Sequence, residues 1–210
     1  MSRILKLAVF AIVAAAQLAA PAWMIGQREW VLRHGMVYKF RTAPVDPYDA
    51  FRGRYVWLRF EGNTAPWTGT GPIPYEMTPS DVIGSGPFVY ATLTTGPDGF
   101  AKFSGASLTR PASGDYLYAR ADYYWDLTAL TRTPITRAPD RLAITLPFDR
   151  YYMNEAAAPA AEQAYREHSN TKKHDAYATV RVWKGHAVLE GLYVGDQRIE
   201  DVPASRPGER

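Results

Sequence analysis

The chain has 210 residues, of which 47% are hydrophobic and 21% charged, so it is too apolar for a disordered protein and long enough to bury a core. It contains no cysteine, which excludes disulfide bonds, thiolate metal sites and cysteine nucleophiles. Two of its 24 Lys and Arg residues lie near the N-terminus, and the other 22 face 21 Asp and Glu, which leaves a charge of +1. A protein without a basic excess is not expected to bind nucleic acid.

Residues 1–26 predict a membrane anchor. Arg3 and Lys6 precede an apolar run over residues 7–25, which as a helix would be about 28 Å long, close to the ~30 Å thickness of a bilayer core. A cleaved secretory signal is the alternative, with residues 20–22 as the cleavage site. The positive-inside rule places the N-terminus in the cytoplasm, so we expect a single-pass protein of the cytoplasmic (inner) membrane with its C-terminal domain outside, in the periplasm.

After the anchor, residues 27–35 predict a juxtamembrane helix or linker that stops at a glycine. Residues 62–87 contain five Pro and five Gly and predict a long surface loop. Residues 156–169 are rich in alanine and predict a helix. Strand or hairpin patterns occur, in chain order, over residues 36–42, 55–61, 87–108, 116–123, 141–147 and 176–199.

These elements predict one exported domain over residues 36–201, followed by a disordered tail over residues 202–210. Its fold class is mainly β, a β-rich α+β arrangement. We expect an antiparallel sandwich or a partly open barrel with one short helix, preceded by the N-terminal transmembrane helix.

Carboxylates are the main candidates for chemistry. A hydrolase could use Asp46 or Asp49 with Glu155 or Glu190, because two converging acids can act as general acid and base. The Asp-Pro-x-Asp spacing of residues 46–49 also describes a turn before a strand, and we favour that structural interpretation. The four histidines lack metal-ligand spacing, so no metal and no cofactor is expected.

Glu190 falls on the same predicted strand face as Val188, Leu192 and Val194. A carboxylate buried among apolar side chains is costly unless a cation pairs with it. We predict that Arg52 is this partner, because a guanidinium binds a carboxylate through two hydrogen bonds.

Aromatic residues offer another interpretation. The chain has 14 Tyr and 6 Trp, and exposed rings on an exported β domain can stack on sugars. Glycan binding would require Trp57, Tyr116 or Tyr118 to lie exposed in a row. Packing in the core is the more common use of such rings.

The stretch DPYDAFRGRYVWLRF, residues 46–60, resembles the signature of the GDYXXLXY family of bacterial proteins. Two positions depart from it: Arg54 stands where the family has Asp, and Phe60 where it has Tyr. Residues 151–155 and 185–195 resemble further family segments. The positions that match the signature are Asp46, Pro47, Asp49, Arg52, Gly53, Tyr55 and Leu58.

The resemblance implies a membrane-anchored exported domain, often associated with multi-span membrane proteins of the DUF2157 and DUF4401 type, and it implies no particular activity. Our leading hypothesis is therefore a non-enzymatic accessory domain of an integral membrane partner, held in the cytoplasmic membrane through residues 7–25. A carboxylate-dependent hydrolase and a glycan-binding envelope domain are the alternatives. No residue is assigned a catalytic role, and the motif residues are structural candidates.

Overall fold

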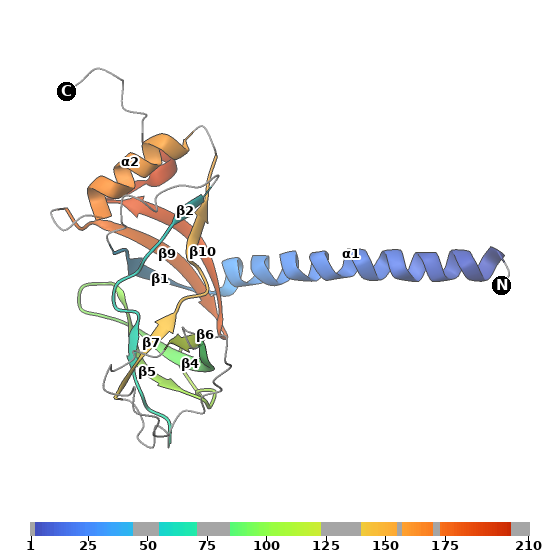
Figure 1. The fold of residues 1–210 in the computed structure, drawn as a ribbon, viewed down its shortest axis with the longest axis horizontal. Coiled ribbons are helices and arrows are strands. Elements are labelled where there is room, and N and C mark those ends of the chain that lie inside the picture. Colours follow the sequence, from blue (N-terminus) through green and yellow to red (C-terminus); the bar gives the residue numbers. More distant parts are fainter. Residues whose placement is uncertain are drawn as a thin grey trace.

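The computed structural model shows a long N-terminal helix that projects from a β-rich domain (Figure 1). The named strands pair in three antiparallel sheets, which confirms the predicted mainly β class with antiparallel strands. The structure describes residues 3–43, 55–70, 85–122, 140–154, 157–169 and 173–202. The predicted tail lies outside this range from residue 203 onward.

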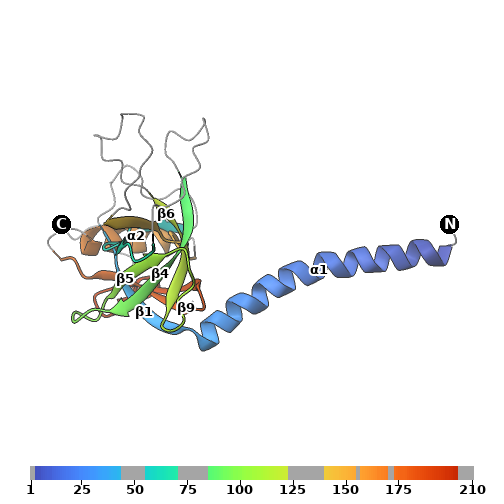
Figure 2. The ribbon, with the colours of Figure 1, turned by 90° about the horizontal axis from the view of Figure 1, so that it is seen from below.

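Helix α1, Arg3–His34, is long and apolar enough to cross a membrane. Its most apolar 18-residue window has a mean hydropathy of 2.0, and none of that window is buried against the protein. Residues 27–35, expected as a separate short helix or linker, form the last turns of the same continuous helix up to His34. The helix ends where the Gly35 amide donates to the Val31 carbonyl at 2.8 Å. Figure 2 shows α1 leaving the domain as one curved rod.

A four-stranded sheet continues directly from this helix. Its strand order is β1-β9-β10-β11. The strands are β1 (Met36–Arg41), β9 (Ala176–Trp183), β10 (His186–Val194) and β11 (Gln197–Arg198). The predicted turn at Lys184 and Gly185 joins β9 to β10.

A five-stranded sheet packs against the first one. Its order is β3-β7-β6-β4-β5, formed by β3 (Thr64–Pro66), β7 (Arg141–Thr145), β6 (Tyr116–Asp122), β4 (Ser85–Thr95) and β5 (Ala101–Ser107). Leu117, Ala119 and Ala121 of β6 are buried, as their alternation predicts. An isolated bridge between Trp67 and Ala106 brings the two edges of this sheet together at one point.

Strand β3 corrects the expectation of one long loop over residues 62–87. It pairs with β7 at the edge of the sheet, where Pro66 is tolerated because an edge strand can do without some ladder hydrogen bonds. Residues 71–84 of the predicted loop lie outside the described residues.

A short ribbon and the second helix complete the domain. The ribbon consists of β2 (Tyr55–Trp57) and β8 (Arg150–Tyr152), and the helix is α2 (Ala158–Ser169), close to its predicted position. In Figure 1, α2 lies over the far end of β9 and β10, away from α1. A single 3-10 turn, Ile199–Asp201, follows β11.

Two apolar clusters form the core. The first lies between the two large sheets and includes Phe40 and Leu117, and the second lies beneath α2 and includes Val56 and Leu192. Phe60 packs against both clusters, so they form one continuous interior. Its ring meets those of Phe40 and Phe148 edge to face, a favourable aromatic geometry.

Candidate functional site

Most of the predicted motif falls outside the described residues. This applies to Asp46, Asp49, Arg52, Gly53, Arg54 and Glu155. Tyr55 opens β2 opposite Tyr152 of β8. Leu58 is only 4% exposed and packs in the cluster beneath α2, while its amide donates to the Asp149 carbonyl at 2.8 Å. The described end of the motif therefore builds the core and the β2–β8 ribbon.

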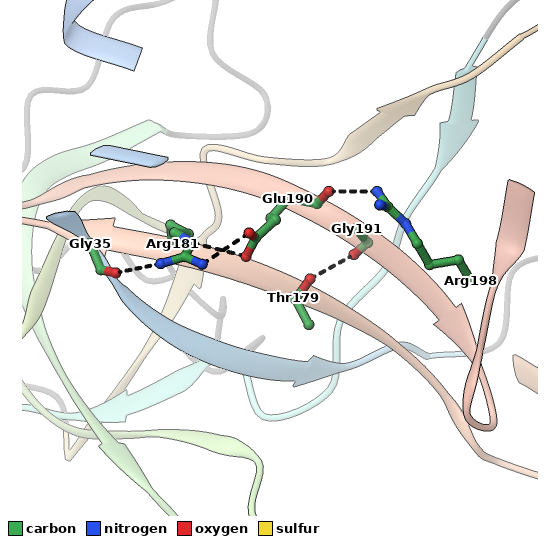
Figure 3. Close-up of polar contacts among 6 residues, drawn as sticks. All are labelled: Gly35, Thr179, Arg181, Glu190, Gly191 and Arg198. Carbon is green, nitrogen blue, oxygen red and sulfur yellow. Dashed lines mark hydrogen bonds and ion pairs between the residues drawn. The ribbon is translucent and has the colours of Figure 1, made fainter. Parts of the chain in front are cut away.

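Glu190 pairs with an arginine on the neighbouring strand. Arg181 of β9 donates two hydrogen bonds to the Glu190 carboxylate, from Nε at 3.0 Å and from Nη2 at 3.1 Å (Figure 3). The side chains of Arg181 and Glu190 are 27% and 35% exposed. The predicted partner, Arg52, lies outside the described residues, and Glu190 obtains its bidentate cation from the neighbouring strand.

A β-bulge explains where Glu190 points. Leu189 faces Val180 and Gly191 faces Thr179 in the β9–β10 ladder, so Glu190 is an extra residue with no β9 residue directly opposite it. The expected single face with Val188, Leu192 and Val194 assumed unbroken alternation, and it is wrong because the bulge changes the phase. Arg198 satisfies the Glu190 carbonyl at 3.1 Å, and Arg181 satisfies the carboxylate.

Arg181 also connects the sheet to α1. Its Nη1 donates to the Gly35 carbonyl at 3.3 Å, directly after the helix (Figure 3). The sequence carried a signal for this pair, because a turn at residues 184–185 places Arg181 opposite Val188 and diagonal to Glu190.

The last turns of α1 are held against the domain at several points. Val31 is 1% exposed, whereas the window that could cross a membrane is entirely unburied. The Gln27 amide lies 3.0 Å from Nε2 of His186, and the His34 ring centroid lies 6.3 Å from that of Trp183 on β9. Helix and domain therefore form one connected unit.

A cavity of about 510 Å³ opens between α1 and the domain. Helix α1 contributes Met24, Gln27 and Arg28, and the domain contributes side chains from β10 and from the segment that leads into β8. A second cavity of about 230 Å³ adjoins it and shares Tyr118, Gly185 and His186 with it. Sequence patterns could not have revealed either cavity, because the lining comes from segments far apart in the chain.

Exposed rings form a strip on the outer face of β4 and β6. The Phe88 and Tyr118 rings stack with centroids 5.1 Å apart, and Tyr90 lies 5.0 Å from Tyr118. Phe88 is 47% exposed and Tyr118 45%, whereas Tyr116 is buried. Of the rings named for glycan binding, Tyr118 belongs to this strip and Tyr116 does not. Trp57, the third, is 45% exposed and lies on β2, in a different sheet.

Other polar pairs are local ties between elements. His174 Nε2 lies 2.6 Å from a Glu61 carboxylate oxygen, and His168 Nδ1 lies 2.7 Å from Asp175. The Tyr38 hydroxyl donates to Asp115 at 2.9 Å, and burial together with this bond raises the pKa of Tyr38 to about 12. Among the described residues, no group of three or more His, Asp or Glu side chains could hold a metal ion.

The fold and the junction thus define a class: an antiparallel β domain fixed to an N-terminal helix that is long and apolar enough to cross a membrane. Within that class the chain belongs to the GDYXXLXY family, since the sequence model of this family, described as GDYXXLXY protein, matches residues 17–192. The match reaches from the middle of α1 into β10, so it includes the helix junction, the whole five-stranded sheet and most of the four-stranded one. No curated protein and no solved structure matches the chain.

Proposed function

We propose that this protein is a single-pass membrane protein whose β domain stands on the outer side of the cytoplasmic membrane as a non-enzymatic accessory of an integral membrane partner. The observation that carries the proposal is the contrast along α1. Its apolar window is entirely unburied, whereas Val31, near its end, is almost fully enclosed by the domain. A large exposed apolar surface on a folded protein indicates a membrane or a protein partner.

The orientation follows from charge. Arg3 and Lys6 stand before the apolar run, and positively charged flanks are retained in the cytoplasm. The β domain then lies on the opposite side. Because the helix continues without a break to His34 and is fixed by Val31, the domain would keep one pose above the membrane rather than swing on a linker.

An accessory role suits this fixed pose. A domain held at a constant height can contact the outer loops of a multi-span protein while α1 packs beside its helices. The alternative of a carboxylate hydrolase is not supported by Glu190, because Arg181 binds both oxygens of its carboxylate. The three other carboxylates named for that activity lie outside the described residues.

Fractionation and cross-linking test the proposal on the full chain. We expect the protein to stay in membranes after alkaline carbonate extraction, and a C-terminal tag to be reached by protease only from the periplasmic side. Cross-linking in intact cells should then yield one integral membrane protein in stoichiometric amount. A Val13→Arg variant, with a charge in the apolar run, should lose both properties. Release by carbonate, or a full-length chain without an integral partner, would contradict the proposal.

Glycan binding is a second candidate because of the ring strip on β4 and β6. The Arg120 guanidinium lies 5.2 Å from the Phe88 ring centroid and adds a hydrogen-bond donor beside the stacked rings. Aromatic rings with neighbouring polar groups suit sugar rings. The test is co-sedimentation of the full chain with purified peptidoglycan sacculi. Tyr118→Ala should abolish binding and Tyr152→Ala, at an exposed ring on β8, should not; no sedimentation of the wild type would exclude this candidate.

A further inference from the structure

We propose that the cavity between α1 and the β domain binds the phosphate headgroup of an anionic phospholipid. This inference rests on the proposed membrane insertion of α1. It adds a ligand site to that function and makes a lipid, rather than the partner protein, its occupant.

The first support is the position of the cavity along the helix. The apolar run ends at residue 25, and Arg28 lies three residues further, a rise of about 4.5 Å along a helix axis. The polar headgroup layer of a bilayer is roughly 5–7 Å thick on each side. If α1 crosses the membrane, Arg28 and the mouth of the cavity therefore lie at the depth of the lipid phosphates.

The second support is charge. The two adjoining cavities are lined by four Arg or Lys side chains and one carboxylate, that of Asp149. Arg150 lies near this carboxylate, with Nε 3.7 Å from Asp149. Arg28 has no hydrogen-bond or ion-pair partner within the described part of the chain. The cations are Arg28, Arg150, Arg110 and Lys184.

A lining with four cations and one carboxylate, which lies beside Arg150, carries a net positive charge and favours an anion. Arginine binds phosphate oxygens through two parallel hydrogen bonds. Anionic lipids attract basic residues near the surface by roughly 1 kcal/mol for each Lys or Arg. The charge of the lining thus matches a phospholipid better than a neutral sugar.

The third support is the mixed chemistry of the walls. Met24 lies at the membrane end of the cavity, and Val31, Phe148 and Val188 contribute apolar surface further in. A free inorganic anion has no apolar groups that could pack against these walls. A phospholipid does, because its glycerol and first acyl carbons follow directly behind the phosphate. These walls therefore favour a lipid over a soluble phosphate compound.

Native mass spectrometry of the full-length protein tests this inference. The protein, held in neutral detergent, would be incubated with equimolar dioleoyl phosphatidylglycerol and dioleoyl phosphatidylcholine. It would then be released from the detergent in the mass spectrometer, and the lipids still bound to it would be counted. We expect selective retention of one phosphatidylglycerol molecule. Arg28→Gln should weaken its retention about fivefold, since one guanidinium contact is lost. Arg28→Lys should keep most of it, because the charge is preserved.

Arg33→Gln is the matched control. It removes the same charge from the same helix, but Arg33 is bonded to Glu29 at 2.8 Å and does not line either cavity. It should retain phosphatidylglycerol as the wild type does. Competition with inorganic phosphate separates a lipid site from a general anion site, because phosphate that displaces the lipid at equal concentration would overturn the lipid assignment.

Equal retention of both lipids by the wild type, or equal behaviour of the Arg28→Gln and Arg33→Gln variants, would also overturn it. Tight retention of an acidic peptide in place of lipid would do the same. Near-ultraviolet circular dichroism verifies that each variant folds. Carbonate extraction separates the two proposals: release from membranes refutes the anchor, whereas firm insertion without lipid selectivity refutes only the lipid site.

Discussion

Arg181 binds both carboxylate oxygens of Glu190 across the β9–β10 ladder and, with its remaining nitrogen, the carbonyl of Gly35. One guanidinium therefore satisfies the bulged residue of β10 and fixes the point where α1 becomes β1. Gly35 has little room for anything larger, because a Cβ there would lie 2.6 Å from the Val31 carbonyl oxygen and 3.1 Å from the backbone of Val182. The helix junction is thus built into the sheet.

Arg181→Met should lower the free energy of unfolding by about 1–2 kcal/mol, because three hydrogen bonds are lost at a site that is only partly shielded from water. Chemical denaturation in detergent measures the change. The double variant Arg181→Met/Glu190→Gln should be less destabilised than the sum of the single variants, since removing both partners leaves no unpaired charge. Additive effects would show that the two side chains do not interact.

Gly185→Ala should destabilise the domain by about 1–2 kcal/mol. Gly185 has φ +90°, and a Cβ there would lie 3.0 Å from the Tyr116 ring and 3.1 Å from Cβ of Tyr118. Lys184, the other turn residue, has φ 47°, which Asn tolerates better than Lys. Thermal melting should therefore show a lower midpoint for Gly185→Ala and an equal or higher one for Lys184→Asn.

Leu117→Ala should cost about 2–5 kcal/mol, because this fully buried side chain fills the space between the two large sheets. Leu108→Ala is the matched control, since Leu108 is exposed. Its substitution should change the free energy of unfolding by less than about 0.5 kcal/mol. Urea titration of both variants checks the difference, and a similar loss in the two would mean that Leu117 is not a core residue.

Stability should fall between about pH 10 and pH 12 through Tyr165. Burial raises the pKa of this phenol from 10.0 to about 12, because the ionised form loses its hydration within the apolar cluster that Tyr165 of α2 shares with Val56 and Tyr151. In that range the unfolded chain has released the proton and the folded chain still holds it, so raising the pH favours unfolding. Below about pH 10 both states are protonated and this group adds no slope.

The decrease from one such group is at most about 1.4 kcal/mol for each pH unit. Melting curves at pH 9 and pH 11.5 compare the wild type with Tyr165→Phe, which lacks the titrating hydroxyl. The variant should lose less stability than the wild type over this range. Equal losses in the two proteins would assign the alkaline transition to other groups.

Much of the architecture was predictable because it depends on local sequence patterns, such as strand alternation and turn glycines. The alternation of residues 117, 119 and 121 placed one face of β6 in the core, and the glycine at 185 marked the turn between β9 and β10. The glycine at position 35 marked the end of the helix, but the apolar run and residues 27–34 form one continuous helix instead of the two segments expected. Strand β3 was missed because its three residues lie among prolines and glycines and pair only through the edge of β7.

By itself, the sequence determined the apolar N-terminal segment, the β-rich class and the family, since these depend on hydrophobic periodicity, turn residues and a contiguous motif. The tertiary structure alone decided the partner of Glu190, the direction of its side chain and the cavity beside α1. A bulge shifts the phase of a strand by one residue without leaving a clear mark in its hydrophobic pattern. The cavity joins residues 24–31 to residues 147–152 and 185–189, and only the packed sheets bring those segments together.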